Sequence, residues 1–256
     1  MAQIWVLTGA DPNSDRPDER DGWVQVREVS DALTRRGHRV TARFVGADLR
    51  GLPRRGEPGC DAVFNLVEAL GGDGRHIDRV PAALAAEGIP FTGASAAAMA
   101  ATTDKLSSKQ RLRDADLPTP AWSADGTGLD PALPVIVKSV HEDASFGLDA
   151  HSVVTGADAA SKIAREARRW GGAWFAEAYI DGREFNLSLI EIGGSVRVLP
   201  VAEIEFRDYA PEQLRLVDYE AKWNADSFGY RNTVRTFLTD PKDAPLIAEL
   251  SRIAVA

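Results

Sequence analysis

Two carboxylates in the stretch 173–190, AWFAEAYIDGREFNLSLI, are the first candidates for chemistry in this sequence. Glu177 and Glu184 stand among apolar residues that alternate with polar ones, a period of two that is typical of β-strands. A half-buried carboxylate needs a partner, and a hydroxyl or amino group of a ligand would supply one. The alternative is a solvated strand edge with two ordinary surface acids, and this stretch alone favours that alternative.

The dipeptide Asp181-Gly182 divides the same stretch into two apolar runs. Such a dipeptide favours a tight reversal, because glycine tolerates a positive φ. The spacing therefore predicts a hairpin, or a strand pair joined by a short loop.

Two lysines are candidate ligands for an anion. Lys105 lies in the first turn of a predicted helix, where its charge opposes the helix dipole and a bound anion would relieve the conflict. Lys138 ends the apolar strand predicted at 134–138, before a loop at 139–149, so a point charge and backbone N–H groups could together hold a phosphate. The alternative is a pair of solvated lysines, and Glu142 and Asp143 bring negative charge into that loop.

The elements that must position these residues can be read from hydrophobic periodicity. Apolar runs at 4–7, 40–45 and 62–66, with a helix between the first two, predict an open parallel α/β sheet in the first ~100 residues. The glycine-rich loop 67–74 follows the third strand, where ligands of such sheets bind, although a plain connection is the alternative. The sequence contains neither the phosphate loop of the common NTPases nor a Gly-x-Gly-x-x-Gly fingerprint.

The later part of the chain continues with further predicted elements. An amphipathic helix is expected at 157–170, strands at 196–201 and 202–206, and a helix capped by Asp240-Pro241. The segment from Val217 to Arg235 is predicted to be a surface loop or, alternatively, a mobile loop over a substrate.

Composition excludes several classes of function. A net charge of −8 argues against nucleic acid or an anionic membrane as a partner, because no basic surplus exists to neutralise phosphates. Cys60 is the single cysteine, so no intramolecular disulfide can form and a cytoplasmic location is expected. No apolar run reaches the ~20 residues that a membrane span requires.

Five stretches, in order, resemble the ATP-grasp superfamily, and most closely the D-alanine–D-alanine ligase family. They cover most of residues 60–223: DAVFNLVEALGGDG, GIPFTGASAAAMAATTDKLSSK, LPVIVKSVHEDASFGL, WFAEAYIDGREFNLSLI and LVDYEAKW. The resemblance implies an ATP-grasp fold of class α/β, with α+β character in the ATP-binding lobes. It implies an N-terminal open parallel α/β lobe at 1–100, a central lobe at 101–182 and an incomplete C-terminal lobe at 183–256, with ATP between the last two.

The resemblance also assigns site residues, by position in the matching motifs. Lys105 and Lys138 look like the lysines that contact phosphates and the adenine side, and Lys222 looks like a further catalytic lysine on the phosphate side. The mobile loop over the phosphates would span residues 142–147 and include the site residues Glu142, Ser145 and Gly147.

The adenosine side of the site is assigned in the same way. Glu177 and Ala178 look like the hinge residues that read the adenine amino group, and Ile180 looks like the residue that packs on the ring. Glu184 looks like the acid that accepts from the ribose hydroxyls. These assignments agree with the residue types, since carboxylates suit hydroxyl and amino donors and lysines suit phosphates.

The chemistry implied is ATP-dependent joining of a carboxylate to an amine through an acyl phosphate, with Mg²⁺ as the companion ion. The partners implied are small-molecule carboxylate and amine substrates, and the related ligases are often homodimers. Several positions that handle the amino acids depart from the family pattern, which favours an amino acid or peptide other than D-alanine. These departures are Ala144 in place of Ser, Trp223 in place of Tyr, Glu68-Ala69 in place of His-Gly, and only the unaligned acids Asp18, Glu19 and Glu28 in the first region.

The family's magnesium ligands, an Asp followed by Glu-x-Asn, are expected beyond residue 256. We therefore expect this sequence to be a truncated piece of a longer enzyme, with little or no turnover by itself. One alternative is a non-catalytic ATP-binding module of the same fold. A further alternative is an ATP-grasp protein that phosphorylates or ligates a quite different acid.

Overall fold

The computed structural model describes residues 1–256, and the chain divides into two compact units. The first unit comprises Met1–Arg111 and Ser139–Ala144, and the second comprises Leu112–Lys138 and Ser145–Ala256. The three-lobe division expected from the sequence stays a prediction. No helix combines the length and the apolarity that are needed to cross a membrane.

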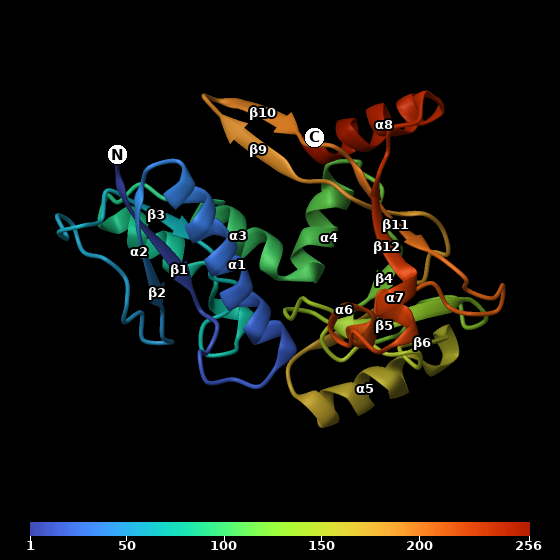
Figure 1. Cartoon of the computed structure of the whole chain (residues 1–256). Coiled ribbons are helices and arrows are strands. Elements are labelled where there is room, and N and C mark those ends of the chain that lie inside the picture. The colour runs from blue at the N-terminus through green and yellow to red at the C-terminus, as the bar shows by residue number, and fades with distance from the viewer. The chain divides into compact units, whose positions relative to one another are not determined.

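The first unit is built on a parallel sheet with strand order β2-β1-β3 (Figure 1). Its strands are β1 (Gln3–Thr8), β2 (Arg39–Phe44) and β3 (Ala62–Asn65), as the apolar runs predicted. Parallel neighbours require a crossover, which α1 provides between β1 and β2. The helices that begin in this unit are α1 (Pro17–Arg35), the short η1 (Gly74–His76), α2 (Arg79–Ala86), α3 (Ala96–Thr103) and α4 (Lys105–Asp114).

The core of the first unit lies between this sheet and α2. Leu7, Val63 and Leu84 are almost completely buried and belong to one hydrophobic cluster. The turn after β1 lies against the glycine-rich loop, because a side chain on Gly9 would meet the carbonyl oxygen of Ala69 at 2.0 Å. Glycine is therefore required at position 9, where two backbones approach closely.

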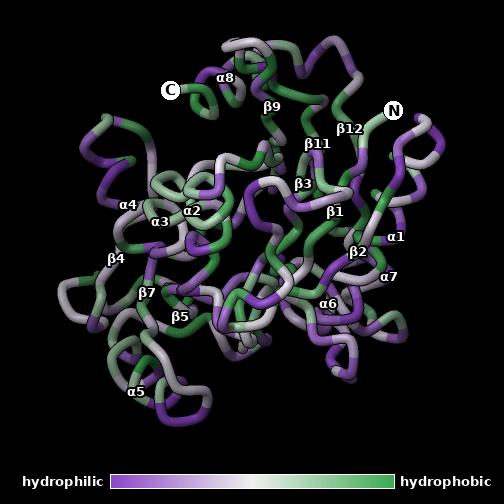
Figure 2. Tube along the Cα trace, turned by 90° about the vertical axis from the view of Figure 1, so that its left-hand side faces the viewer, coloured by the Kyte–Doolittle hydropathy of each residue, from purple (hydrophilic) through white to green (hydrophobic).

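The second unit contains a four-stranded sheet with order β4-β7-β5-β6, covered by α5. Val135, Val137 and Trp174 form its core with Ala159 of α5. Figure 2 shows hydrophilic and hydrophobic residues mixed along α5, as expected for a helix with one buried face. The elements of this layer are β4 (Trp122–Ser123), β5 (Pro134–Ser139), β6 (Val153–Thr155), η2 (Gly156–Asp158), α5 (Ala159–Trp170) and β7 (Trp174–Ala178).

The rest of the second unit is a three-stranded antiparallel sheet, order β12-β11-β8, and the hairpin β9–β10 (Figure 1). The strands are β8 (Glu184–Asn186), β9 (Leu189–Ile192), β10 (Ser195–Val198), β11 (Ala202–Phe206) and β12 (Thr233–Phe237). The helices are α6 (Tyr219–Trp223), α7 (Phe228–Asn232), η3 (Pro241–Asp243) and α8 (Ala244–Val255).

The predicted hairpin around Asp181-Gly182 is wrong. β7 pairs within the four-stranded sheet, whereas β8 pairs with β11 in the other sheet. Gly182 does not adopt the left-handed conformation that a tight reversal would use. The connection is instead held by Arg215, which pairs with Asp181 at 3.2 Å and accepts a hydrogen bond from the Tyr179 hydroxyl through its carbonyl oxygen at 2.9 Å.

The prediction of a loop from Val217 to Arg235 is also partly wrong. It contains two short helices, α6 and α7, and the start of β12. Each helix begins at a residue whose side chain accepts a backbone N–H, Asp218 for α6 and Ser227 for α7. These helices have five residues each, so they are too short to show a helical period in the sequence.

Candidate functional site

Lys138 and Glu177 face each other on neighbouring strands of the four-stranded sheet. The Lys138 ammonium forms an ion pair with Oε1 of Glu177. The Glu177 side chain is only 11% exposed, and that of Lys138 is 29% exposed, so the pair is largely withdrawn from water. A largely buried carboxylate keeps its charge when a cation neutralises it, which explains why β5 and β7 carry these two residues together.

Glu184 on β8 and Lys222 on α6 complete a charged group. Glu184 keeps exposed surface, but nearby protein atoms still desolvate its carboxylate, and this burial raises its pKa. Lys222 and then Lys138 act in the opposite direction and lower that pKa, so both ammonium groups lie within electrostatic range of Glu184. Lys138, Glu177, Glu184 and Lys222 are called the lysine–glutamate cluster below.

The other residues expected on the adenine side, Ala178 and Ile180, lie at the end of β7 and just after it. The N–H of Ala178 donates to the carbonyl oxygen of Ala121 at 2.8 Å, so Ala178 can serve an amino donor only through its own carbonyl oxygen. The Ile180 side chain is 67% exposed and offers an apolar surface. An acceptor followed by an apolar side chain suits a flat ring that carries an amino group.

Ser145 is tied to the segment that leads into α6. Its hydroxyl donates to the carbonyl oxygen of Val217 at 2.7 Å. Its backbone has a φ of 60°, in the left-handed region that costs a non-glycine residue conformational energy. The strained loop is therefore anchored to the segment that carries Lys222.

Gly147 and Phe146 dock the same loop on an aromatic surface. The ring of Phe146 lies 5.3 Å from that of Trp170 and 6.4 Å from that of Trp174, centroid to centroid. Gly147 has a φ of 69°, and a side chain there would meet Trp174 Cη2 at 2.5 Å. The tryptophans thus hold the end of the predicted phosphate loop, a role that the sequence interpretation missed.

Lys105 and Glu142 lie in the first unit. The Lys105 ammonium donates to the carbonyl oxygen of Glu142 at 2.9 Å and pairs with the Asp143 carboxylate, also at 2.9 Å. The conflict between this lysine and the helix dipole is therefore relieved by loop 139–144 of its own unit. The sequence interpretation missed Asp143 as the partner, because residues 38 positions apart give no local signal.

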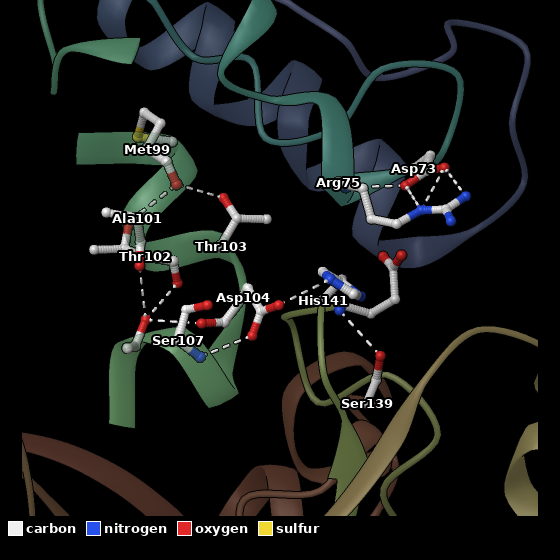
Figure 3. A network of polar contacts seen from close by, with 12 residues as sticks. Asp73, Arg75, Met99, Ala101, Thr102, Thr103, Asp104, Ser107, Ser139 and His141 are labelled. Carbon is white, nitrogen blue, oxygen red and sulfur yellow. Dashed lines mark hydrogen bonds and ion pairs between the residues drawn. The ribbon is translucent and has the colours of Figure 1, made fainter. Parts of the chain in front are cut away.

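The Glu142 carboxylate has a different environment from its backbone. Burial raises its pKa, Asp73 raises it further, and the backbone of Gly74 lowers it. Figure 3 shows the polar network of the same unit, in which His141 lies 3.6 Å from the Asp104 carboxylate. These contacts fasten loop 139–144 to the start of α4.

The predicted site residues thus form two groups. The second unit holds Lys138, Ser145, Gly147, Glu177, Ala178, Ile180, Glu184 and Lys222, and the first unit holds Lys105 and Glu142. Within the second unit, Lys138 pairs with Glu177, and Lys222 and Lys138 act electrostatically on Glu184.

The residues present do not form a magnesium site. No group of three or more His, Cys, Asp or Glu side chains is arranged to hold a metal ion. Mg²⁺ prefers octahedral oxygen coordination, and the Glu177 carboxylate of the lysine–glutamate cluster is paired with Lys138. The magnesium ligands expected beyond residue 256 stay a prediction.

The combination of these sheets is the ATP-grasp fold. The crystal structure of the D-alanine–D-alanine ligase from Bacillus anthracis in complex with ATP matches 99% of this chain and 76% of that chain, with a TM-score of 0.67 and 17% identity. At that identity the likeness concerns the fold, and it confirms the predicted fold class.

Sequence comparison identifies the family. Residues 128–248 match the family model of the D-ala D-ala ligase C-terminus. The D-alanine–D-alanine ligase of Synechococcus sp. is 32% identical over 231 residues, which are 86% of this chain and 65% of that protein. The uncharacterized protein y4sG of Sinorhizobium fredii is 36% identical over 167 residues, 64% of this chain and 48% of that protein. The chain is similar to the D-alanine–D-alanine ligase-like family, and it spans about half to two thirds of the length of these relatives.

Proposed function

We propose that this chain is part of an ATP-dependent carboxylate–amine ligase and that residues 1–256 alone have little or no turnover. The lysine–glutamate cluster is the observation that supports the proposal most directly, because Lys138 pairs with Glu177 and both Lys138 and Lys222 act electrostatically on Glu184. The family relationship adds support, and a relative of the same fold was crystallised with ATP.

The predicted site residues of the second unit that lie outside the loop each have a role in this proposal. The ammonium groups of Lys138 and Lys222 neutralise phosphate oxygens, which a lysine does as a point charge. The Glu184 carboxylate accepts hydrogen bonds from the ribose hydroxyls. The carbonyl oxygen of Ala178 accepts from the adenine amino group, and Ile180 packs on the ring. Glu177 positions the Lys138 ammonium through their ion pair.

The loop residues extend the phosphate site. Lys105 exchanges its Asp143 partner for a phosphate oxygen, while Glu142, Ser145 and Gly147 belong to the loop that covers the phosphates. The anchor of Ser145 on Val217 couples that loop to the segment carrying Lys222.

The reaction transfers the γ-phosphoryl group of ATP to a substrate carboxylate, giving an acyl phosphate and ADP. An amine then attacks the acyl carbon, the C–N bond forms, and inorganic phosphate leaves. The lysines stabilise the charge on the transferring group, a form of electrostatic catalysis. We propose small-molecule substrates, an amino acid or peptide other than D-alanine, and Mg²⁺ as the companion ion of ATP.

Nucleotide binding tests the proposal, measured by isothermal titration with ATP. Lys138→Ala and Glu184→Ala should each weaken binding by about 1.5–3 kcal/mol, since each removes a charged hydrogen bond. Lys242→Ala is the matched control, because this lysine pairs with Asp240 at 2.8 Å and belongs to no predicted site. Unchanged ATP affinity in both site variants would contradict the assignment.

The second candidate function is ATP binding without catalysis. Residues 1–256 contain no group of three metal-ligating side chains, and because the magnesium ligands are expected beyond residue 256, this observation is compatible with both candidates. Phosphate release with ATP, Mg²⁺ and a panel of amino acids and dipeptides separates the two. Turnover that depends on an amino acid would exclude the second candidate and would also contradict the expectation that residues 1–256 have little turnover by themselves.

A further inference from the structure

A pocket of about 400 Å³ lies in the second unit, between residues 209–216 and the helices α6 and α7. Its wall combines the aromatic rings of Tyr209 and Phe228 with the aliphatic side chains of Leu214 and Leu216. Pockets of this size, with mostly apolar walls and a few polar groups, are typical of small-molecule sites.

The aromatic part of the wall is held in place by its own contacts. The rings of Tyr209 and Phe228 lie 5.1 Å apart, centroid to centroid, and Phe206 packs edge-on against Tyr209 at 5.2 Å. Ordered aromatic faces attract cations through their quadrupoles. The wall therefore suits a ligand that joins an apolar chain to a positive charge.

The polar part of the wall carries only negative charge. Glu212, Asp218 and Glu220 line the pocket, and its lining includes no lysine, arginine or histidine. Asp218 accepts the N–H of Ala221 at 2.8 Å, and Glu220 accepts from the Asn224 amide at 2.5 Å, but none of the three carboxylates forms an ion pair. Burial raises the pKa of Asp218, hydrogen bonds from the backbone of Ala221 and Glu220 lower it, and the negative charges of Glu220 and Asp149 raise it further.

The pocket is distinct from the lysine–glutamate cluster. Glu220 and Lys222 are two positions apart on α6, and two residues turn an α-helix by about 200°. Glu220 therefore faces the pocket from one side of α6 while Lys222 projects from the other. A ligand in the pocket would leave the proposed nucleotide residues free.

We propose that this pocket binds an organic cation, a primary ammonium or guanidinium group on a short apolar chain. The charged group pairs with the carboxylates of Glu212 and Asp218, and the chain packs on Tyr209, Phe228 and the two leucines. The inference does not depend on ligase activity, because it rests on the pocket lining alone.

The test is isothermal titration of the whole chain with n-butylguanidinium in the absence of nucleotide. Its uncharged analogue n-butylurea has nearly the same shape, so a difference between the two reports the charge. We expect n-butylguanidinium to bind and n-butylurea to bind at least about tenfold more weakly. Equal affinity of the two probes, or binding of neither, overturns the proposal.

Variants locate the binding. The double variant Glu212→Gln/Asp218→Asn removes two charges, and asparagine at position 218 can still cap α6. It should weaken n-butylguanidinium about tenfold to a hundredfold. Phe228→Leu removes an aromatic face while keeping apolar bulk, and should weaken the same probe several-fold. Unchanged affinity in both variants overturns the proposal.

The control variant is Glu191→Gln, an exposed acid on β9 that is not part of the pocket. It should bind n-butylguanidinium as the parent chain does, and an equal loss in the control overturns the assignment to this pocket. ATP affinity of the double variant is measured in parallel. Retained ATP binding together with lost cation binding is the expected result, so failure of this proposal and failure of the proposed function give different patterns.

Discussion

The carboxylate of Glu177 holds the ammonium group of Lys138 in position through their ion pair. Breaking a largely buried pair leaves an uncompensated charge, so Glu177→Gln should cost more stability than a surface substitution. We expect a loss of about 1–3 kcal/mol for Glu177→Gln, read from urea denaturation. The double variant with Lys138→Met should be less unstable than the sum of the two single variants, and additive losses would show that the two side chains are not coupled.

Gly147 offers a test of the loop anchor. Its φ is 69°, and a side chain would meet Trp174 Cη2 at 2.5 Å. Gly147→Ala should therefore lose about 1–2 kcal/mol from the backbone and more from the clash. Gly172→Ala is a matched control, with a φ of 68° and nothing within 4 Å. Urea denaturation should give a larger loss at position 147, and equal losses would contradict the contact with Trp174.

The candidate site residues that could be proposed from the sequence are those whose residue type is unusual in its local setting. Lys138 and Glu184 stand out as charges in apolar strands. Asp143 and Trp174 could not be assigned their roles in this way. The first acts on Lys105, 38 positions away, and the second acts on Gly147, 27 positions away. Periodicity reports which face a residue occupies, but it does not report which distant residue shares that face.

The short helix η1 makes a prediction at the scale of an element. Asp73 caps it by accepting the N–H of Arg75 at 2.9 Å and pairs with the Arg75 guanidinium at 2.5 Å. Hydrogen bonds from the Arg75 side chain lower the pKa of Asp73 to about 2. Because the folded pKa lies below the unfolded value of 3.8, this carboxylate stabilises the fold above pH ~4, and the stabilisation disappears as the pH falls toward 2.

Asp73→Asn measures that contribution, since asparagine still caps the helix but cannot pair with Arg75. The variant should lose about 0.5–1 kcal/mol at pH 6, the range of a partly exposed pair, and should match the parent chain near pH 2. Urea denaturation at both pH values gives the comparison, with Asp31→Asn as the control because Asp31 is an exposed residue of α1. If the difference in the free energy of unfolding between Asp73→Asn and the parent chain grew on acidification, folding would not lower the pKa of Asp73 as predicted.

The elements were predicted best where apolar residues recur over a long enough stretch. The strands at 3–8, 39–44 and 62–65 and the helix at 159–170 lie where the sequence indicated. The pairing of strands was harder to predict, because the alternation in 174–190 says nothing about which neighbour each strand takes. The sequence pattern therefore predicted one hairpin from β7 and β8, although the two strands belong to different sheets.

At the scale of the whole molecule, each compact unit has a hydrophobic core of its own. Leu84 belongs to the core of the first unit and is fully buried, and Phe175 is almost fully buried in β7 of the second unit. Units with separate cores can unfold as separate cooperative steps. We therefore predict two transitions in differential scanning calorimetry of the chain.

Core substitutions assign each transition to its unit. Leu84→Ala should destabilise the first unit by about 2–5 kcal/mol, and Phe175→Ala should destabilise the second by about 3–5 kcal/mol. Each variant should lower the temperature of one transition and leave the other within error, because distant and independent sites act separately. A single transition that both variants lower together would mean that the two cores unfold as one. ATP added to the parent chain should raise the transition that Phe175→Ala lowers, because Lys138, Glu177, Glu184 and Lys222 all belong to the second unit.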